Sequence, residues 1–85
     1  LLQINYRFPE NNLVASIRIF DLNGYMVKNL GNNRLLGTSG SFTWDGRDQS
    51  GAELRMGTYV VYMEVFSAKG WTAHFKEACV LARRR

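Results

Sequence analysis

The segment 44–51, with the sequence WDGRDQSG, holds the residues whose chemistry best suits ion binding. Asp45 and Asp48 are three residues apart and stand among hydroxyl and carbonyl groups. These are the hard oxygen ligands that Ca²⁺ prefers. The segment lacks the alternating ligands of an EF-hand loop and its closing glutamate. The pattern therefore favours a structural role, in which both carboxylates accept hydrogen bonds from backbone N–H groups in tight turns.

The other residues of this segment fit the structural interpretation. Gly46 and Gly51 can take backbone conformations that are closed to residues with a side chain. Trp44 is a large apolar side chain at the start of the loop and is expected to anchor it in the core. We predict a loop that holds no metal and needs no cofactor.

His74 and Cys79 are the only histidine and the only cysteine of the chain. They could serve as general base and nucleophile only if their side chains met. Their odd spacing of five places them on opposite faces of a regular strand. A single cysteine excludes an internal disulfide, and one cysteine with one histidine does not complete a tetrahedral zinc site. We predict that the protein is not an enzyme and that Cys79 is a small buried hydrophobe.

Length and composition bound the class of protein. Eighty-five residues form one domain, because a second hydrophobic core would not fit. Hydrophobic residues make up 46% and charged residues 21% of the chain, with no long apolar run, which excludes disorder and insertion into a membrane. The chain opens with Leu1 rather than Met and has no signal-peptide pattern. We therefore expect a module of a longer polypeptide.

The positive charge is concentrated at the C-terminal tip. The formal net charge is +4, and Arg83, Arg84 and Arg85 supply three of the eleven basic residues. Without them, eight basic residues face seven acidic ones, which leaves +1. A nearly neutral body offers no basic face that could follow nucleic-acid phosphates, so binding to nucleic acid is not expected.

Alternation of apolar and polar residues predicts strands rather than helices. A turn at 21–24 and a loop at 31–40 are expected from their Gly and Asn residues. Strand 58–66 is rich in β-branched and aromatic residues on both faces, which predicts a central strand that is covered on both sides. A bulge near Lys76 and Glu77 would return Glu77 to solvent. The expected strands are 2–8, 14–20, 25–30, 41–44, 58–66 and 71–81.

These short strands, separated by frequent turns, predict an all-β fold. The expected architecture is an antiparallel immunoglobulin-like β-sandwich of about seven strands that fills residues 1–85 as one domain. The cysteine pair that brackets a tryptophan in true immunoglobulin domains is absent.

Three segments of the chain resemble a known family. Residues 17–30, 40–51 and 57–65 are similar to the immunoglobulin-like domain of the flagellar hook-capping protein and to related C-terminal domains of secreted bacterial proteins. Arg55 and Met56 stand where the family usually has a proline. The matching residues are Ile17, Ile19, Phe20, Asp21, Gly24 and Val27, then Trp44, Asp45, Gly46, Asp48 and Gly51, then Gly57 and Tyr59.

The resemblance implies a noncatalytic C-terminal sorting domain that the type IX secretion machinery of Bacteroidetes-like bacteria recognises. The recognised tip would consist of Lys76 and the run 83–85, and the protein would pass through the periplasm to the cell surface or medium. The alternative is a structural spacer or assembly module, as in a hook cap, whose partners are neighbouring domains. A third interpretation is carbohydrate binding through Trp71, Tyr25 and Tyr62.

Overall fold

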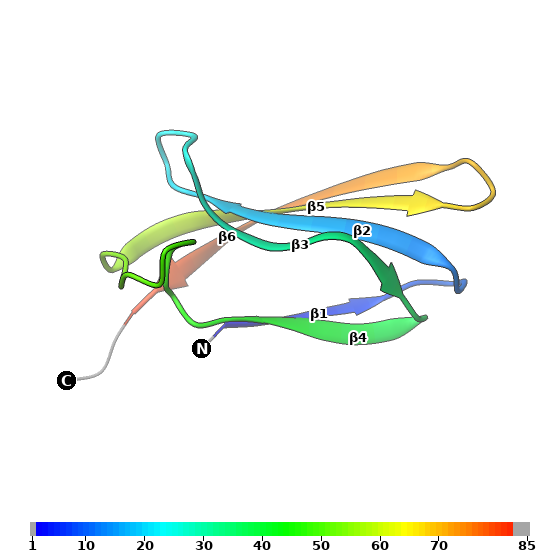
Figure 1. Ribbon diagram of the computed structural model, residues 1–85, viewed down its shortest axis with the longest axis horizontal. Coiled ribbons are helices and arrows are strands. Elements are labelled where there is room, and N and C mark those ends of the chain that lie inside the picture. Colours follow the sequence, from blue (N-terminus) through cyan, green and yellow to red (C-terminus); the bar gives the residue numbers. More distant parts are fainter. Residues whose placement is uncertain (1, 83–85) are drawn as a thin grey trace.

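The computed structural model describes residues 2–82, which form two stacked antiparallel sheets and no helix (Figure 1). The larger sheet has the strand order β3-β2-β5-β6, and the smaller sheet pairs β1 with β4. The predicted all-β, immunoglobulin-like sandwich is confirmed, with six strands in the described part of the chain rather than about seven. The strands are β1 (Leu2–Arg7), β2 (Leu13–Phe20), β3 (Met26–Leu36), β4 (Ser39–Trp44), β5 (Gly57–Ser67) and β6 (Thr72–Leu81).

The predicted turn between β2 and β3 is confirmed. One carboxylate oxygen of Asp21 accepts hydrogen bonds from the backbone N–H groups of Asn23 (2.9 Å) and Tyr25 (3.0 Å). Gly24 has a φ of +88°, a conformation that favours glycine. The turn is therefore encoded by residues within a few positions of one another.

The prediction of a loop at 31–40 is wrong, because β3 continues through most of this segment. Only Gly37 and Thr38 join β3 to β4. The pairing of β2 with β3 contains register shifts, the first of them between Ala15 and Ile17. Such irregularities absorb extra residues and allow a strand that is rich in Gly and Asn to stay paired. The hydroxyl of Ser16 supports this by accepting a hydrogen bond from the backbone N–H of Asn33 (3.3 Å).

The prediction of a bulge in β6 is also wrong. The register between β5 and β6 is unbroken from the Gly57–Leu81 pair to the Phe66–Thr72 pair. Glu77 therefore stays on the core side of the strand, in register with the buried Val61. It is nevertheless exposed, because no strand pairs with the free edge of β6 in the described part of the chain.

Strand β5 is central in the larger sheet, as expected, since it lies between β2 and β6. The expectation that both of its faces are covered is wrong. Its inward side chains, such as Tyr59 and Val65, are buried. Its outward side chains are partly exposed, and Phe66 has 41% of its surface accessible, because the smaller sheet covers only one face.

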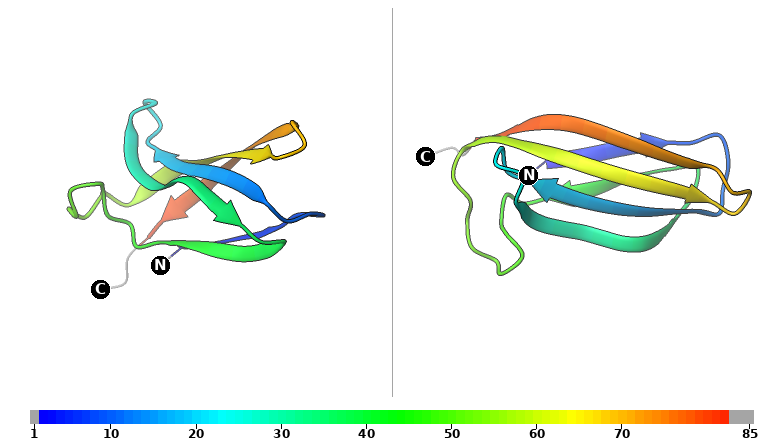
Figure 2. Two further views of the ribbon diagram at one scale, coloured as in Figure 1. Left: turned by 45° about the vertical axis from the view of Figure 1, so that its right-hand side comes forward. Right: turned by 90° about the horizontal axis from the view of Figure 1, so that it is seen from above.

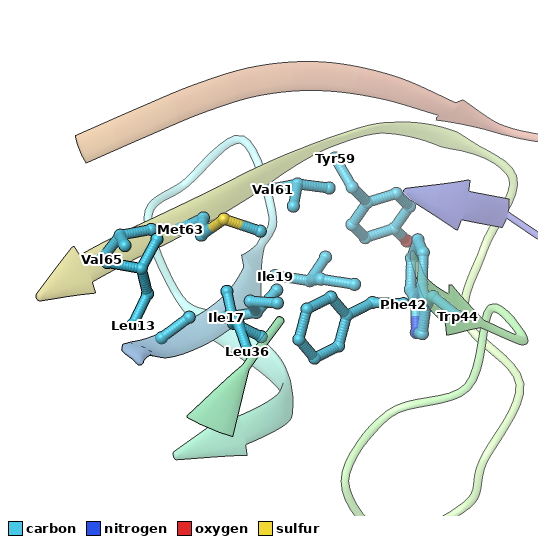
Figure 3. Packing of buried hydrophobic residues seen from close by; sticks show 11 residues of the cluster. Leu13, Ile17, Ile19, Leu36, Phe42, Trp44, Tyr59, Val61, Met63 and Val65 are labelled. Atoms are coloured by element: carbon cyan, nitrogen blue, oxygen red, sulfur yellow. The ribbon is translucent and has the colours of Figure 1, made fainter. Parts of the chain in front are cut away.

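The hydrophobic core fills the space between the two sheets (Figure 3). Trp44 and Tyr59 pack edge to face, with their ring centroids 5.5 Å apart. The core therefore joins the loop after β4 to the start of β5. It consists of Leu13, Ala15, Ile17, Ile19, Leu36, Phe42, Trp44, Tyr59, Val61, Met63 and Val65.

Candidate functional site

Trp44 holds the start of the WDG loop against the core. Its side chain is 1% exposed, and its indole N–H donates a hydrogen bond to the backbone carbonyl of Arg47 (3.0 Å). Asp45 turns the chain between them by accepting a hydrogen bond from the N–H of Arg47 (3.0 Å). Gly46 has a φ of +80°, which favours glycine at the tip of this turn. The packing and the turn thus depend on each other.

Asp48 organises the second half of the loop. One of its carboxylate oxygens accepts hydrogen bonds from the N–H of Ser50 (2.9 Å), the hydroxyl of Ser50 (2.7 Å) and the N–H of Ala52 (2.9 Å). The hydroxyl hydrogen bond from Ser50 is the largest influence that lowers the pKa of Asp48, and the N–H of Ala52 acts in the same direction. The carboxylate therefore serves as the local acceptor of this turn.

The loop is also tied to β3. The N–H of Gln49 donates to the carbonyl of Val27 (2.9 Å), and the side-chain oxygen of Gln49 accepts from the N–H of Asn29 (2.9 Å). Residues 2–82 contain no group of three or more His, Cys, Asp or Glu side chains that could hold a metal ion. The geometry supports a loop that fixes the sandwich at one end.

We expect the melting temperature of the domain to be the same with added Ca²⁺ and with a chelator. A ligand that binds the folded state raises the melting temperature by mass action, whereas carboxylates that serve as turn acceptors give no such effect. The double variant Asp45→Asn with Asp48→Asn serves as the control. A rise with Ca²⁺ in the wild type that is lost in this variant would identify an ion site.

The lowered pKa of Asp48 predicts a defined pH dependence. The charged carboxylate stabilises the fold above the ordinary pKa of 3.8, and this contribution disappears as the pH falls through the lower folded-state value. Urea midpoints of the wild type and Asp48→Asn should therefore differ at neutral pH and converge below 3.8. A constant difference across this range would contradict the assignment.

The third family segment forms a tyrosine corner. The hydroxyl of Tyr59 donates a hydrogen bond to the carbonyl of Arg55 (2.8 Å), four residues upstream. Immunoglobulin-like sandwiches place such a tyrosine near the start of a central strand, where it fixes the corner between the sheets. Arg55 and Met56 thus accommodate the corner without the proline that is usual at this place.

His74 and Cys79 lie on opposite faces of β6. His74 is on the outer face, where its Nδ1 is 2.9 Å from the hydroxyl of Tyr62 and 3.7 Å from a carboxylate oxygen of Glu64. Cys79 packs against the core, and burial raises the pKa of its thiol. The structure does not bring the two side chains together into a nucleophile–base pair.

The aromatic residues considered for sugar binding are also dispersed. Tyr25 is 71% exposed at the β2–β3 turn, whereas Trp71 lies at the β5–β6 turn at the other end of the sheet (Figure 1). The indole N–H of Trp71 donates to a carboxylate oxygen of Glu10 (2.6 Å), which ties the β5–β6 turn to the chain between β1 and β2. Tyr62 lies between these ends, on β5.

Of the residues assigned to a sorting tip, the structure describes only Lys76. Lys76 lies in the middle of β6, in register with Tyr62 on the outer face. Arg83, Arg84 and Arg85 lie outside the described residues.

One feature escaped the sequence analysis, namely a groove between β1 and β6. The right-hand view of Figure 2 places both strands along the same margin of the sandwich. The sequence offered one signal of this groove: Glu77 alternates with Phe75 and Cys79, which places a charged residue on the same face of the strand as two apolar ones. The groove has a volume of about 510 Å³, and its lining includes all of β1, Phe8, Val61, Met63, Phe75, Glu77 and Cys79.

Comparison with known proteins agrees with this geometry. The family model of the FlgD Ig-like domain matches residues 2–69, which span β1 to β5 with the turn, the WDG loop and the tyrosine corner. No curated protein and no solved structure matches the chain. Within residues 2–82, no helix is long and apolar enough to cross a bilayer. Because the model matches most of the chain, the protein belongs to the FlgD Ig-like domain family.

Proposed function

We propose that this protein is a noncatalytic structural module of a longer exported polypeptide, and that it joins neighbouring domains or partner subunits into an assembly. The observation that carries the proposal is the match to the FlgD Ig-like domain over residues 2–69. A flagellar hook cap is an assembly, and the chain shares the residues that build this family's domain. The module would act outside the cytoplasm, after passage through the periplasm.

The contacts of the shared residues support this role. Asp21, Asp45 and Asp48 direct carboxylate oxygens at backbone N–H groups of their own turns. Trp44 and Tyr59 pack together in the core. These residues therefore stiffen one end of the β-sandwich, where the β2–β3 turn and the WDG loop meet the start of β5, which suits a module that holds a neighbour in a fixed orientation.

Type IX sorting is the narrower interpretation. It depends on the basic run 83–85 and on the strand before it. The fall in net charge from +4 to +1 without the three arginines supports a polarised chain end. A reporter fused ahead of residues 1–85 should then reach the medium in a host that has this machinery, and a version lacking Arg83 to Arg85 should remain in the periplasm.

Deleting residues 1–85 from the reading frame that carries them tests the main proposal. We expect the remaining polypeptide to fold and to be exported but to form smaller assemblies, as measured by light scattering after size-exclusion chromatography. Assemblies of unchanged size would overturn the assembly role. Retention of the deleted version in the periplasm would support sorting instead.

A further inference from the structure

The groove between β1 and β6 is bounded by two free strand edges. Strand β1 pairs only with β4, and β6 pairs only with β5, within the part of the chain that the structure describes. A free edge presents a row of backbone N–H and C=O groups that another strand can pair with. The side chains of Leu2, Ile4 and Tyr6 point inward from β1 and make the floor of the groove apolar.

The smaller sheet has room for one more strand. An immunoglobulin sandwich of the constant type has seven strands, divided into sheets of four and three. Here the sheets have four and two strands. The free edge of β1 faces the groove, and Phe75, which lines it from β6, keeps 45% of its surface exposed.

Glu77 gives the groove a specific charge. Its side chain stands among Val61, Phe75 and Cys79, and it makes no hydrogen bond or ion pair within residues 2–82. A carboxylate beside apolar surface is stabilised by a cation that approaches with the ligand. The groove therefore selects an apolar segment that carries one basic residue.

The free edge favours an extended segment. Six residues of β1 span about 20 Å, and only an extended chain can pair with the backbone groups along this length, because a helix satisfies its N–H and C=O groups internally. A second copy that paired through its own β1 would fit poorly, because the inward face of that strand carries only Leu2, Ile4 and Tyr6 and brings no cation to Glu77. Arg7 stands at an exposed position of the alternating β1 pattern, although part of it lines the end of the groove.

From these observations, we propose that the β1–β6 groove binds an extended strand of a partner polypeptide. The strand adds to the free edge of β1, directs alternate apolar side chains into the groove, and places a lysine or arginine opposite Glu77. This inference rests on the proposed assembly function, for which it supplies the contact and the chemistry of the partner.

A pair of synthetic peptides tests the proposal. The first is Val-Thr-Val-Thr-Lys-Thr-Val-Thr-Val, and the matched control carries Glu in place of Lys. In an NMR titration of the labelled domain, the Lys peptide should shift the amide signals of β1 and β6. It should bind about fivefold more tightly than the Glu peptide. The variant Glu77→Gln, which changes an exposed side chain, should remove this preference.

Each peptide is also tethered ahead of residue 1 through a Gly-Ser linker, so that weak affinity does not hide binding. The tethered Lys strand should protect the amides of β1 from hydrogen exchange and raise the melting temperature. Unchanged protection with both tethered peptides would overturn the proposal, and equal binding of both would overturn the role of Glu77. Concentration-dependent dimerisation with shifts in β1 would assign the groove to a second copy.

These measurements on the isolated domain are independent of the deletion experiment. If the domain binds the strand but the deletion leaves the size of the assemblies unchanged, the assembly function is contradicted. The groove then remains a strand-binding site. If the deletion gives smaller assemblies but the domain binds no strand, the assembly function is supported. The proposal that the β1–β6 groove binds a strand is then rejected.

Discussion

Trp44→Ala should lower the free energy of unfolding by about 3 to 5 kcal/mol, the largest effect of any single substitution considered for this domain. The indole is 1% exposed, packs edge to face on Tyr59, and donates a hydrogen bond to the carbonyl of Arg47. The substitution therefore opens a cavity and releases the WDG loop at the same time. Urea unfolding followed by circular dichroism measures the loss.

Trp44→Phe is the matched variant and should remain folded. It keeps an aromatic ring in the core but removes the indole N–H that donates to Arg47. We expect it to lose about 1 to 3 kcal/mol, less than the alanine variant. An alanine variant with an unchanged urea midpoint would contradict the placement of Trp44 in the core.

Leu36→Ala should lower the free energy of unfolding by about 2 to 4 kcal/mol, whereas Leu35→Ala should change it by less than about 0.5 kcal/mol. The two leucines are neighbours at the end of β3, yet Leu36 is 4% exposed and Leu35 is 74% exposed. Leu36 belongs to the core, and Leu35 points to solvent from the same strand. Urea midpoints of the two variants provide the comparison.

This pair tests the strand that the sequence analysis did not predict. In a loop at 31–40, neither leucine would have a fixed face, and the two substitutions would have similar effects. In β3, they differ because successive side chains of a strand point to opposite faces. If both substitutions lowered the free energy of unfolding equally, the result would favour a loop at 31–40 and contradict the register of β3 with β2.

Much of the fold follows from local patterns. Strict alternation predicts β1, and the turn after β2 follows from Asp21 and Gly24, whose partners lie within a few residues. The WDG loop is similar, because Asp45 and Asp48 accept hydrogen bonds from N–H groups two to four residues away. Local hydrogen bonds of this kind depend little on the rest of the chain.

Other features required the tertiary structure. The Gly- and Asn-rich part of β3 carries no strand signal of its own and is held by β2, whose register shifts only the pairing reveals. Glu77 breaks the apolar pattern of β6, which suggested a bulge that the unbroken register with β5 excludes. The sequence by itself determined the turns, the alternating strands and the family, because these depend on neighbouring residues. The tertiary structure decided the length of β3, the side on which Glu77 lies and the groove beside β1, because register and free edges depend on strands far apart in the chain.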